Sequence, residues 1–174
     1  MTDLGAHIRD IPDFPKPGIL FKDITPLLLD AEALGQAVAE LADWARPLDV
    51  DFVAAAEARG FILGAALARE LGAGFVPARK PGKLPHETVA AEYILEYGVD
   101  ALEMHADALA DGARVLLHDD LLATGGTAAA LAELIESTGA EIVGCAFLVE
   151  LAFLRGRDRL EGYDVHALLT YDGE

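Results

Sequence analysis

The chain has 174 residues, 53% of them hydrophobic, so it is long and apolar enough to bury the core of one domain and is not intrinsically disordered. Thirty acidic residues against thirteen basic ones give a formal net charge of −17, which argues against a nucleic-acid-binding surface. No apolar run approaches the roughly 20 residues of a membrane-spanning helix, and the N-terminal residues lack the basic and hydrophobic regions of a signal peptide. We therefore expect a single cytoplasmic domain, residues 1–174, with neither a nucleic acid nor a membrane as partner.

The N-terminal 29 residues begin with a proline-rich stretch. Pro12, Pro15, Pro17 and Gly18 block a regular helix and favour turns. The short apolar segment that follows, residues 19–24, is expected to form an ordered flap. Phe21 in this flap could stack on a planar base or could belong to the core, and the residues alone leave both interpretations open.

Helices and strands then alternate. Apolar residues recur at helical spacing over residues 30–46, with Asp30 as the N-cap, and again over residues 61–71, with Gly72 as the end of the helix. Short apolar runs at residues 51–56 and 74–78 predict buried strands. The turn at residues 57–60 contains Arg59, whose planar guanidinium suits phosphate oxygens. An ordinary ion pair between Arg59 and the nearby Glu57 explains the same residues equally well.

The densest positive charge lies in the next loop. Residues 79–88 contain Arg79, Lys80 and Lys83, two prolines and no periodicity, a composition that fits either a mobile lid or a merely solvated loop. Alternating residues from 89 to 97 predict a strand, and a turn at residues 98–100 would pair it with residues 102–105. Glu96 would lie near this turn, where it would ordinarily count as a surface carboxylate.

Residues 114–137 read as strand, loop and helix. The apolar strand ends in Asp119 and Asp120, and the loop opens into an alanine-rich helix over residues 128–137. Glycines in such a loop let successive backbone N–H groups converge on an anion at the start of the helix. No lysine stands where a nucleotide-triphosphatase loop has one, so the loop suits a single terminal phosphate. The expected phosphate-binding residues are Ala123, Thr124, Gly125, Gly126 and Thr127.

Asp119 and Asp120 stand beside this loop, near whatever carries the phosphate. Their carboxylates could accept hydrogen bonds from sugar hydroxyls, orient a hydrated Mg²⁺, or stabilise positive charge that develops on a sugar ring. The alternative is that Asp120 caps a turn and Asp119 is a solvated strand end. His118, just before them, is expected to be a half-buried residue hydrogen-bonded to backbone.

Two more strands complete the chain, at residues 141–150 and 164–170, and the first contains Cys145 as a buried small residue. Between them, Arg157 and Arg159 could form an exposed basic turn or salt bridges between subunits. The alternation of strands and helices predicts an α/β fold with an open, mostly parallel sheet and helices on both faces.

The segment Asp119-Asp-Leu-Leu-Ala-Thr-Gly-Gly-Thr127 resembles the phosphoribosyl pyrophosphate (PRPP) signature of type I phosphoribosyltransferases, in the form found in adenine phosphoribosyltransferases. Residues 13–27 resemble the base-recognising N-terminal segment of that family, residues 57–61 its pyrophosphate loop, and residues 79–85 its catalytic loop. The resemblance runs from Phe14 to about Leu169. It implies the type I phosphoribosyltransferase fold, with a base-binding flap at residues 1–29 and a mobile lid loop and hairpin at residues 79–105.

The resemblance also implies an activity, the Mg²⁺-dependent transfer of the 5-phosphoribosyl group from PRPP to N9 of adenine, with AMP and pyrophosphate as products. The nearest alternative is a 6-oxopurine phosphoribosyltransferase, but those relatives typically carry an aspartate where this chain has Ala123. A second alternative is a regulator that binds PRPP without turning it over. Such proteins usually include a DNA-binding module, for which this acidic chain has no room.

Finally, the resemblance assigns roles to the candidate site residues. Glu96 would approach the base, Asp119 and Asp120 would contact the ribose and, indirectly, a Mg²⁺ held mainly by PRPP, and the chain would act as a homodimer. Backbone groups around Leu20 and Lys22 would read the base edge, so the arginine that relatives often have in place of Lys22 should matter little. The base would be bound by Leu20, Phe21 and Lys22, and pyrophosphate by Arg59, Arg79, Lys80 and Lys83, partly across the dimer interface.

Overall fold

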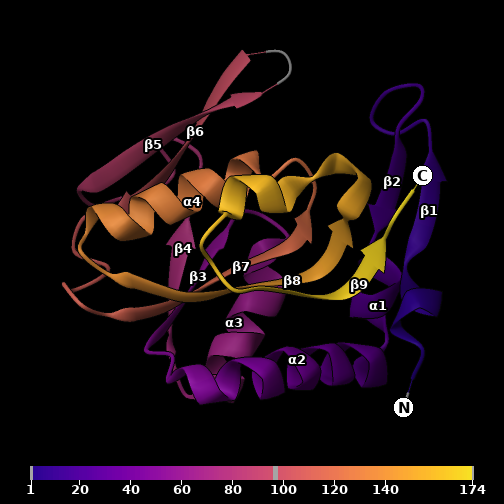
Figure 1. The fold of residues 1–174 in the computed structure, drawn as a ribbon, viewed down its shortest axis with the longest axis horizontal. Helices are drawn as coiled ribbons and strands as arrows, with labels where there is room; N and C mark the ends of the chain where they lie inside the picture. The colour runs from indigo at the N-terminus through magenta and orange to yellow at the C-terminus, as the bar shows by residue number, and fades with distance from the viewer. Residues whose placement is uncertain (1, 96–97, 174) are drawn as a thin grey trace.

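A five-stranded parallel sheet forms the centre of the protein (Figure 1), seen in a computed structural model that describes residues 2–95 and 98–173. Its strand order is β4-β3-β7-β8-β9, so the strand that carries the acid pair, β7, is central. The strand is buried on both faces, as expected for a run of Val and Leu in a parallel sheet. The strands are β3 (Phe52–Ala56), β4 (Gly74–Ala78), β7 (Arg114–Leu122), β8 (Glu141–Leu151) and β9 (Val165–Tyr171).

Helices cover both faces of this sheet, which confirms the predicted fold class. Figure 1 shows α2 (Ala31–Ala45) and α3 (Gly60–Leu71) below the sheet and α4 (Gly126–Ser137) above it. A short helix, α1 (Thr25–Leu29), precedes α2, and 3-10 turns occupy Leu4–His7, Arg46–Leu48, Ala152–Leu154 and Gly156–Leu160. Within the described ranges, none of the helices is both long and apolar enough to cross a membrane.

Two antiparallel hairpins stand apart from the central sheet. The first, β1 (Arg9–Pro12) with β2 (Leu20–Asp23), contains the predicted flap. The second, β5 (Thr88–Leu95) with β6 (Gly98–His105), follows the basic loop. The predicted turn at residues 98–100 is wrong, because Val99 pairs with Ile94 and Asp100 with Tyr93 inside the hairpin. Tertiary pairing has extended a strand through a Gly-Val-Asp sequence that, read locally, favours a turn.

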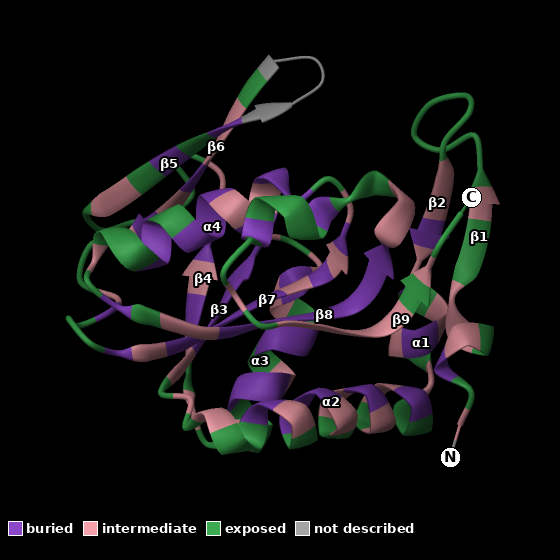
Figure 2. Ribbon diagram, viewed as in Figure 1, coloured by how far each residue is buried: buried purple, intermediate pink, exposed green. Residues whose placement is uncertain are grey.

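The core lies on both sides of the sheet, as the purple segments of Figure 2 show. Alternate residues of β7 face opposite ways, so that Val115 and Leu117 pack toward α4 while Leu116 packs toward α2 and α3. Cys145 is buried, as predicted, and burial raises the pKa of its thiol to about 12. Its place in the core makes it an inert packing residue.

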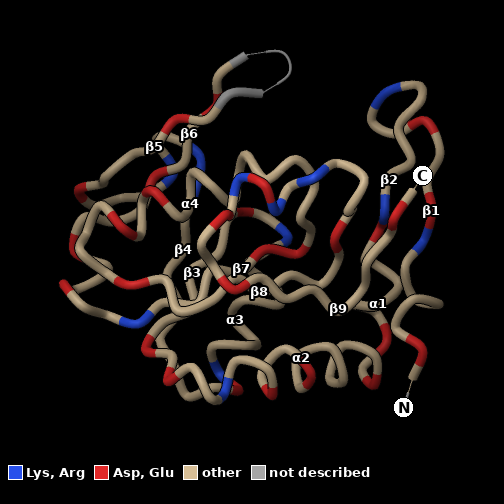
Figure 3. Tube along the Cα trace, viewed as in Figure 1, with Lys and Arg blue, Asp and Glu red and all other residues tan. Residues whose placement is uncertain are grey.

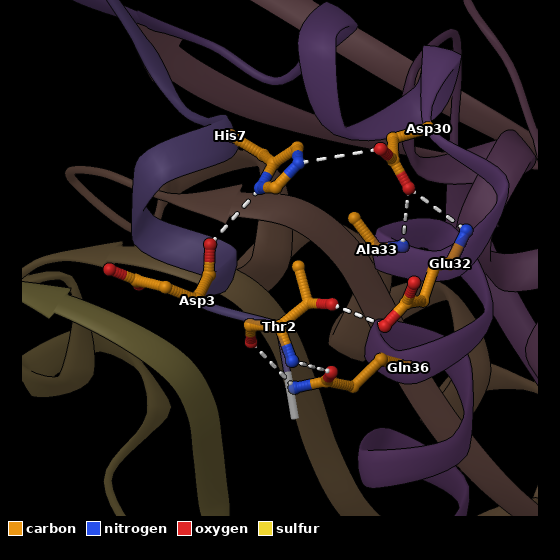
Figure 4. A network of polar contacts seen from close by, with 7 residues as sticks. All are labelled: Thr2, Asp3, His7, Asp30, Glu32, Ala33 and Gln36. Carbon is orange, nitrogen blue, oxygen red and sulfur yellow. Dashed lines mark hydrogen bonds and ion pairs between the residues drawn. The ribbon is translucent and has the colours of Figure 1, made fainter.

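The N-terminal residues are fastened to α2 by a polar network (Figure 4). The Asp30 carboxylate accepts hydrogen bonds from the N–H groups of Glu32 and Ala33, both at 2.9 Å, which confirms the predicted N-cap. His7 Nε2 lies 3.6 Å from the same carboxylate, and the Thr2 N–H donates to Gln36 Oε1 at 2.7 Å. The first turn of the chain is therefore tied to the scaffold just before the flap begins.

Candidate active site

The loop between β7 and α4 forms a cradle of backbone donors. Gly125 has φ +82° and begins the helix without any side-chain cap, so the first amide groups of α4 are free of side-chain partners. Two boundaries differ from the prediction: β7 continues to Leu122, and α4 starts at Gly126 rather than at Ala128. Asp119 and Asp120 therefore lie inside the strand and not at its last residues. Gly125 takes a left-handed conformation and is the N-cap residue of α4, so the loop ends there and the helix begins earlier than predicted.

A cavity of about 290 Å³ opens over this cradle at the carboxyl edge of the sheet, where open parallel sheets bind ligands. It brings together residues from the turn after β3, the basic loop, the β5–β6 hairpin, the end of β7, the loop that follows it and the start of α4. Figure 3 shows several basic segments on this side of the sheet, although acidic residues are spread over the whole chain. The wall consists of residues 57–59, Lys80, Tyr93, Leu102 and residues 119–128.

The acid pair lies in this wall and is joined to Arg59. Arg59 Nε forms an ion pair with Asp120 Oδ2 at a distance of 2.9 Å. Among the described residues, no donor makes a well-aligned hydrogen bond to this oxygen. Asp119 Oδ1 accepts a hydrogen bond from the Asp120 N–H at 2.9 Å. A Cβ added to Gly60 would lie 2.6 Å from Asp119 Oδ1, so a larger residue where α3 begins would displace the Asp119 carboxylate. Arg59 thus pairs with Asp120 and not with its neighbour Glu57.

Burial raises the pKa of both carboxyl groups of the acid pair. Burial, reinforced by the neighbouring Asp120 charge, raises the pKa of Asp119 well above its ordinary value. Burial also raises the pKa of Asp120, while the Arg59 guanidinium opposes the shift. Asp119 keeps some exposure toward the cavity, but the protein surrounds it closely enough for burial to dominate. The pair consequently holds a proton at pH values where a free aspartate would have lost it, and a cation in the cavity would draw that proton off.

The flap contacts the site through Phe21. The Arg59 guanidinium lies 4.9 Å from the centre of the Phe21 ring, a cation–π contact, and the Phe14 ring meets Phe21 edge-on at 5.1 Å. Phe21 is only partly buried, so the structure favours an accessible ring over a core residue. Leu20 and Lys22 flank it on β2, and the Lys22 side chain is buried against Asp10, at 2.7 Å, away from the cavity wall.

Glu57 anchors the start of the basic loop. Its carboxylate accepts hydrogen bonds from the Lys80 N–H at 2.5 Å and from Arg79 Nη2 at 3.0 Å. Burial would raise the pKa of Glu57, but these hydrogen bonds more than offset it and lower the pKa below the ordinary value. Of the predicted pyrophosphate ligands, Arg59 and Lys80 line the cavity, whereas Arg79 and Lys83 are absent from the wall as far as the structure describes it.

Tyr93 and Leu102 are site residues that the sequence reasoning missed. Lys80 Nζ contacts the Tyr93 hydroxyl at 3.1 Å and forms an ion pair with Asp100, so the β5–β6 hairpin holds the lysine at the cavity wall. The strand alternation around Tyr93 was visible in the sequence, but it gave no sign of which face would meet the cavity. Glu96 and Tyr97 lie outside the described residues.

Arg157 is exposed, but its guanidinium is bound within the same chain. Its Nε and Nη2 each lie 2.7 Å from one carboxylate oxygen of Glu150, and its Nη1 donates to the carbonyl of Val165 at 2.8 Å. The exposure of Arg157 fits the predicted basic turn, and a salt bridge to another subunit stays a prediction. The contact that the sequence did not predict is the one with the buried Glu150 carboxylate of the same chain. Arg159 stays exposed on the same turn.

His118 is fully buried directly before the acid pair, whereas the sequence predicted a half-buried residue with a backbone hydrogen bond. Neither ring nitrogen makes a well-formed hydrogen bond to any described residue. Burial lowers the pKa of His118 to about 4, and the nearby Ala146 backbone opposes the shift only weakly. The ring packs instead against α3, where a Cβ on Gly64 would lie 3.3 Å from its Cδ2.

Replacing His118 with valine should change how stability depends on pH. The unfolded chain protonates this histidine near pH 6.5, but the folded chain does so only near pH 4, so folded stability falls as the pH drops between these values. The loss amounts to about 2 to 3 kcal/mol at pH 4.5. Urea unfolding of both proteins at pH 8 and pH 4.5 should show the variant gaining about that much relative to the parent at the lower pH. Equal losses in both proteins would contradict a neutral buried imidazole.

Comparison with known proteins agrees with this geometry. Residues 27–168 match the family model of the phosphoribosyl transferase domain. The adenine phosphoribosyltransferase of Thermotoga neapolitana is 57% identical over 169 residues, which cover 97% of this chain and 99% of that protein. That of Solibacter usitatus is 57% identical over 172 residues, which cover 99% of each chain.

Two solved structures are similar to this chain as well. The adenine phosphoribosyltransferase of Thermoanaerobacter pseudethanolicus superposes with a TM-score of 0.95 at 55% identity, over 97% of this chain and 98% of that one. The Saccharomyces cerevisiae enzyme, complexed with an imino-altritol bisphosphate and adenine, has a TM-score of 0.90 at 39% identity, over 95% of this chain and 96% of that one. The chain therefore belongs to the adenine phosphoribosyltransferase family.

Proposed function

We propose that this enzyme transfers the 5-phosphoribosyl group of PRPP to N9 of adenine and releases AMP and pyrophosphate. One observation carries the proposal: a loop that leads into a helix with no side-chain cap among the described residues shares one cavity with the acid pair, and Arg59 lies 2.9 Å from Asp120. A phosphorylated sugar matches this combination because its phosphate suits the loop and its hydroxyls suit the carboxylates. The adenine and sugar-like bisphosphate bound by the yeast relative support the same choice of ligands.

We assign the substrate groups to the cavity as follows. The 5-phosphate would bind the amides of residues 123–127, and the ribose would lie over Asp119 and Asp120. Pyrophosphate would lie near Arg59 and Lys80, the two basic residues of the cavity wall. The base would stack near Phe21, whose ring already contacts Arg59. Backbone groups of Leu20 and Lys22 would read the base edge, since the Lys22 side chain is occupied by Asp10.

The reaction would proceed with positive charge on the sugar. Departure of pyrophosphate breaks the bond between ribose C1 and oxygen, and attack by N9 from the opposite face forms the bond between C1 and nitrogen, with loss of the N9 proton. Between these events the charge is shared by C1 and the ring oxygen, where nearby carboxylates stabilise it. Glu96, outside the described residues, stays a prediction as the group that assists the proton loss.

Magnesium fits the site as a substrate-bound ion. The described residues contain no cluster of three or more His, Cys, Asp or Glu side chains that could hold a metal by themselves. Asp119 and Asp120 supply two carboxylates, enough to contact a hydrated Mg²⁺ whose other ligands come from PRPP. When bound, the ion would neutralise charge on the departing pyrophosphate.

The lid and the oligomeric state belong to the same proposal. Arg79 and Lys83 lie on the loop that Glu57 anchors, and we propose that they reach pyrophosphate when residues 79–105 close over the cavity. Closure would exclude water from a sugar that water can also attack. A homodimer, in which some of these residues act across the interface, stays a prediction, as do the single-domain organisation of residues 1–174, the flap at residues 1–29 and a cytoplasmic location.

Adenine should be the preferred acceptor. Ala123 provides no side-chain acceptor or donor next to the base, so nothing there would favour a 6-oxopurine. Pyrophosphate release should be measured with PRPP, Mg²⁺ and each of adenine, hypoxanthine, guanine and xanthine. We expect kcat/KM for adenine to exceed the others by about a hundredfold or more, because unpaired polar groups on the wrong base cost binding energy. Equal rates with hypoxanthine would favour a 6-oxopurine enzyme, and binding of PRPP without turnover would favour a regulator.

A further inference from the structure

The turn that contains Gly156 lies directly against the back of the phosphate-binding loop. A Cβ on Gly156 would collide with the carbonyl oxygen of Ala123, and its distance to Leu122 Cδ1 would be 2.9 Å. Conversely, a Cβ on Gly125 would lie 2.5 Å from the carbonyl oxygen of Gly156. The two backbones therefore touch with no side chain between them, so a shift of the turn must displace the loop.

An ion pair holds this turn to the sheet. Arg157 binds the Glu150 carboxylate with two parallel hydrogen bonds of 2.7 Å each, and Glu150 is 4% exposed. Glu150 is next to last in β8, where it pairs with Leu122 of β7 and Thr170 of β9. The other end of the turn is anchored by the buried side chain of Leu160. A rigid connection thus runs from β8 through Glu150 and Arg157 to Gly156 and the loop.

We propose that Glu150 and Arg157 are positioning residues that set the shape of the phosphate-binding loop. Arg157 does not act on the ligand directly, since three of its N–H groups are used inside the protein and the described wall of the cavity does not include it. Its bidentate geometry is what matters, because it fixes the turn in both distance and angle. The inference rests on the proposed function, in which this loop binds the 5-phosphate.

Lysine at position 157 keeps the charge but cannot form two parallel bonds. Arg157→Lys should therefore let the turn and the loop shift while leaving the rest of the cavity intact. We expect its affinity for ribose 5-phosphate to fall on the order of tenfold. The KM for PRPP should rise by a similar factor, with kcat within about twofold of the parent because the acid pair is untouched. Affinity for pyrophosphate should be unchanged, since Arg59 and Lys80 lie elsewhere in the wall.

Two further variants complete the test. Glu150→Gln keeps the shape and the hydrogen-bonding oxygen while removing the charge, and should weaken ribose 5-phosphate binding by about threefold. Glu150→Gln also tests the proposal by itself if Arg157→Lys fails to fold. Arg155→Lys is the matched control, because Arg155 is two residues away and pairs with the exposed Asp158, at 2.7 Å. Calorimetric titration of each full-length protein with ribose 5-phosphate and, separately, with pyrophosphate measures the effect.

Selective loss of ribose 5-phosphate affinity in Arg157→Lys and Glu150→Gln, with Arg155→Lys unchanged, supports the positioning role. Affinities equal to those of the control overturn it. Equal weakening for ribose 5-phosphate and pyrophosphate also overturns it, because that pattern reports a general disturbance of the fold. Failure of the parent protein to bind ribose 5-phosphate or to form AMP is a different result, which counts against the proposed function itself.

Discussion

Replacement of Asp119 and Asp120 by asparagine should lower kcat about a thousandfold. A carboxylate about 4 Å from a developing positive charge, at an effective dielectric constant near 20, stabilises that charge by on the order of 4 kcal/mol. Asparagine retains the shape and loses the charge, so substrate should still bind while the transition state is destabilised. Steady-state kinetics with saturating adenine and PRPP would measure the effect.

Stability distinguishes this result from simple misfolding. Burial already raises the pKa of both carboxyl groups, so neutral asparagines relieve the cost of burying charge, whereas the loss of the Asp120–Arg59 ion pair acts in the opposite direction. The urea unfolding midpoint should therefore stay close to that of the parent protein. Asp43→Asn is a suitable control, because Asp43 is an exposed residue of α2 whose carboxylate pairs with Arg46. A loss of kcat below tenfold in the double variant would show that the acid pair does not stabilise the sugar cation.

The second large effect is expected at Gly125. An alanine there must adopt φ +82°, and its Cβ would lie 2.5 Å from the carbonyl oxygen of Gly156. The strain of the left-handed conformation alone costs about 1 to 2 kcal/mol, and the collision forces the loop out of place as well. We expect the KM for PRPP to rise on the order of a hundredfold, the cost of misplacing a binding group by about 1 Å.

Gly112→Ala separates these two contributions. Gly112 has φ +75°, but a Cβ there would meet nothing within 4 Å. The control variant should therefore lose stability from strain and keep the KM for PRPP of the parent protein. If the two variants had the same KM, the shape of the loop at Gly125 would be irrelevant to phosphate binding.

Local chemistry explains what the sequence predicted well. Asp30 begins a helix through its side chain, and Gly72 ends a helix through its backbone conformation. Both roles can be predicted without knowing the fold. The phosphate loop and the acid pair are likewise adjacent in the chain, and their proximity needed no tertiary information. Similarity to the family then confirmed the fold class and the activity.

Contacts between segments that are far apart in the sequence explain the ion pairs that the sequence did not predict. Arg59 has Glu57 two residues away, yet it pairs with Asp120, because β3 lies beside β7 in parallel register. Lys22 turns toward Asp10 for the same kind of reason, since those residues face each other across the first hairpin. The choice among several nearby carboxylates depends on strand register, which the charges in a sequence do not specify.

Arg157 gives the clearest case. Three basic residues at positions 155, 157 and 159 look alike in the sequence, but only Arg157 meets the buried Glu150. The partner comes from the end of β8, whose last residues look like any apolar strand with one acidic residue. Burial of that single carboxylate, a consequence of packing between β7 and β9, decides which arginine is held in place.

A crystal structure of the protein with AMP bound tests the central claim most directly. We expect the phosphate oxygens to accept hydrogen bonds from the amides of residues 123–127, with the ribose hydroxyls facing Asp119 and Asp120 and adenine beside Phe21. A phosphate bound elsewhere, or a ribose turned away from the acid pair, would contradict the account.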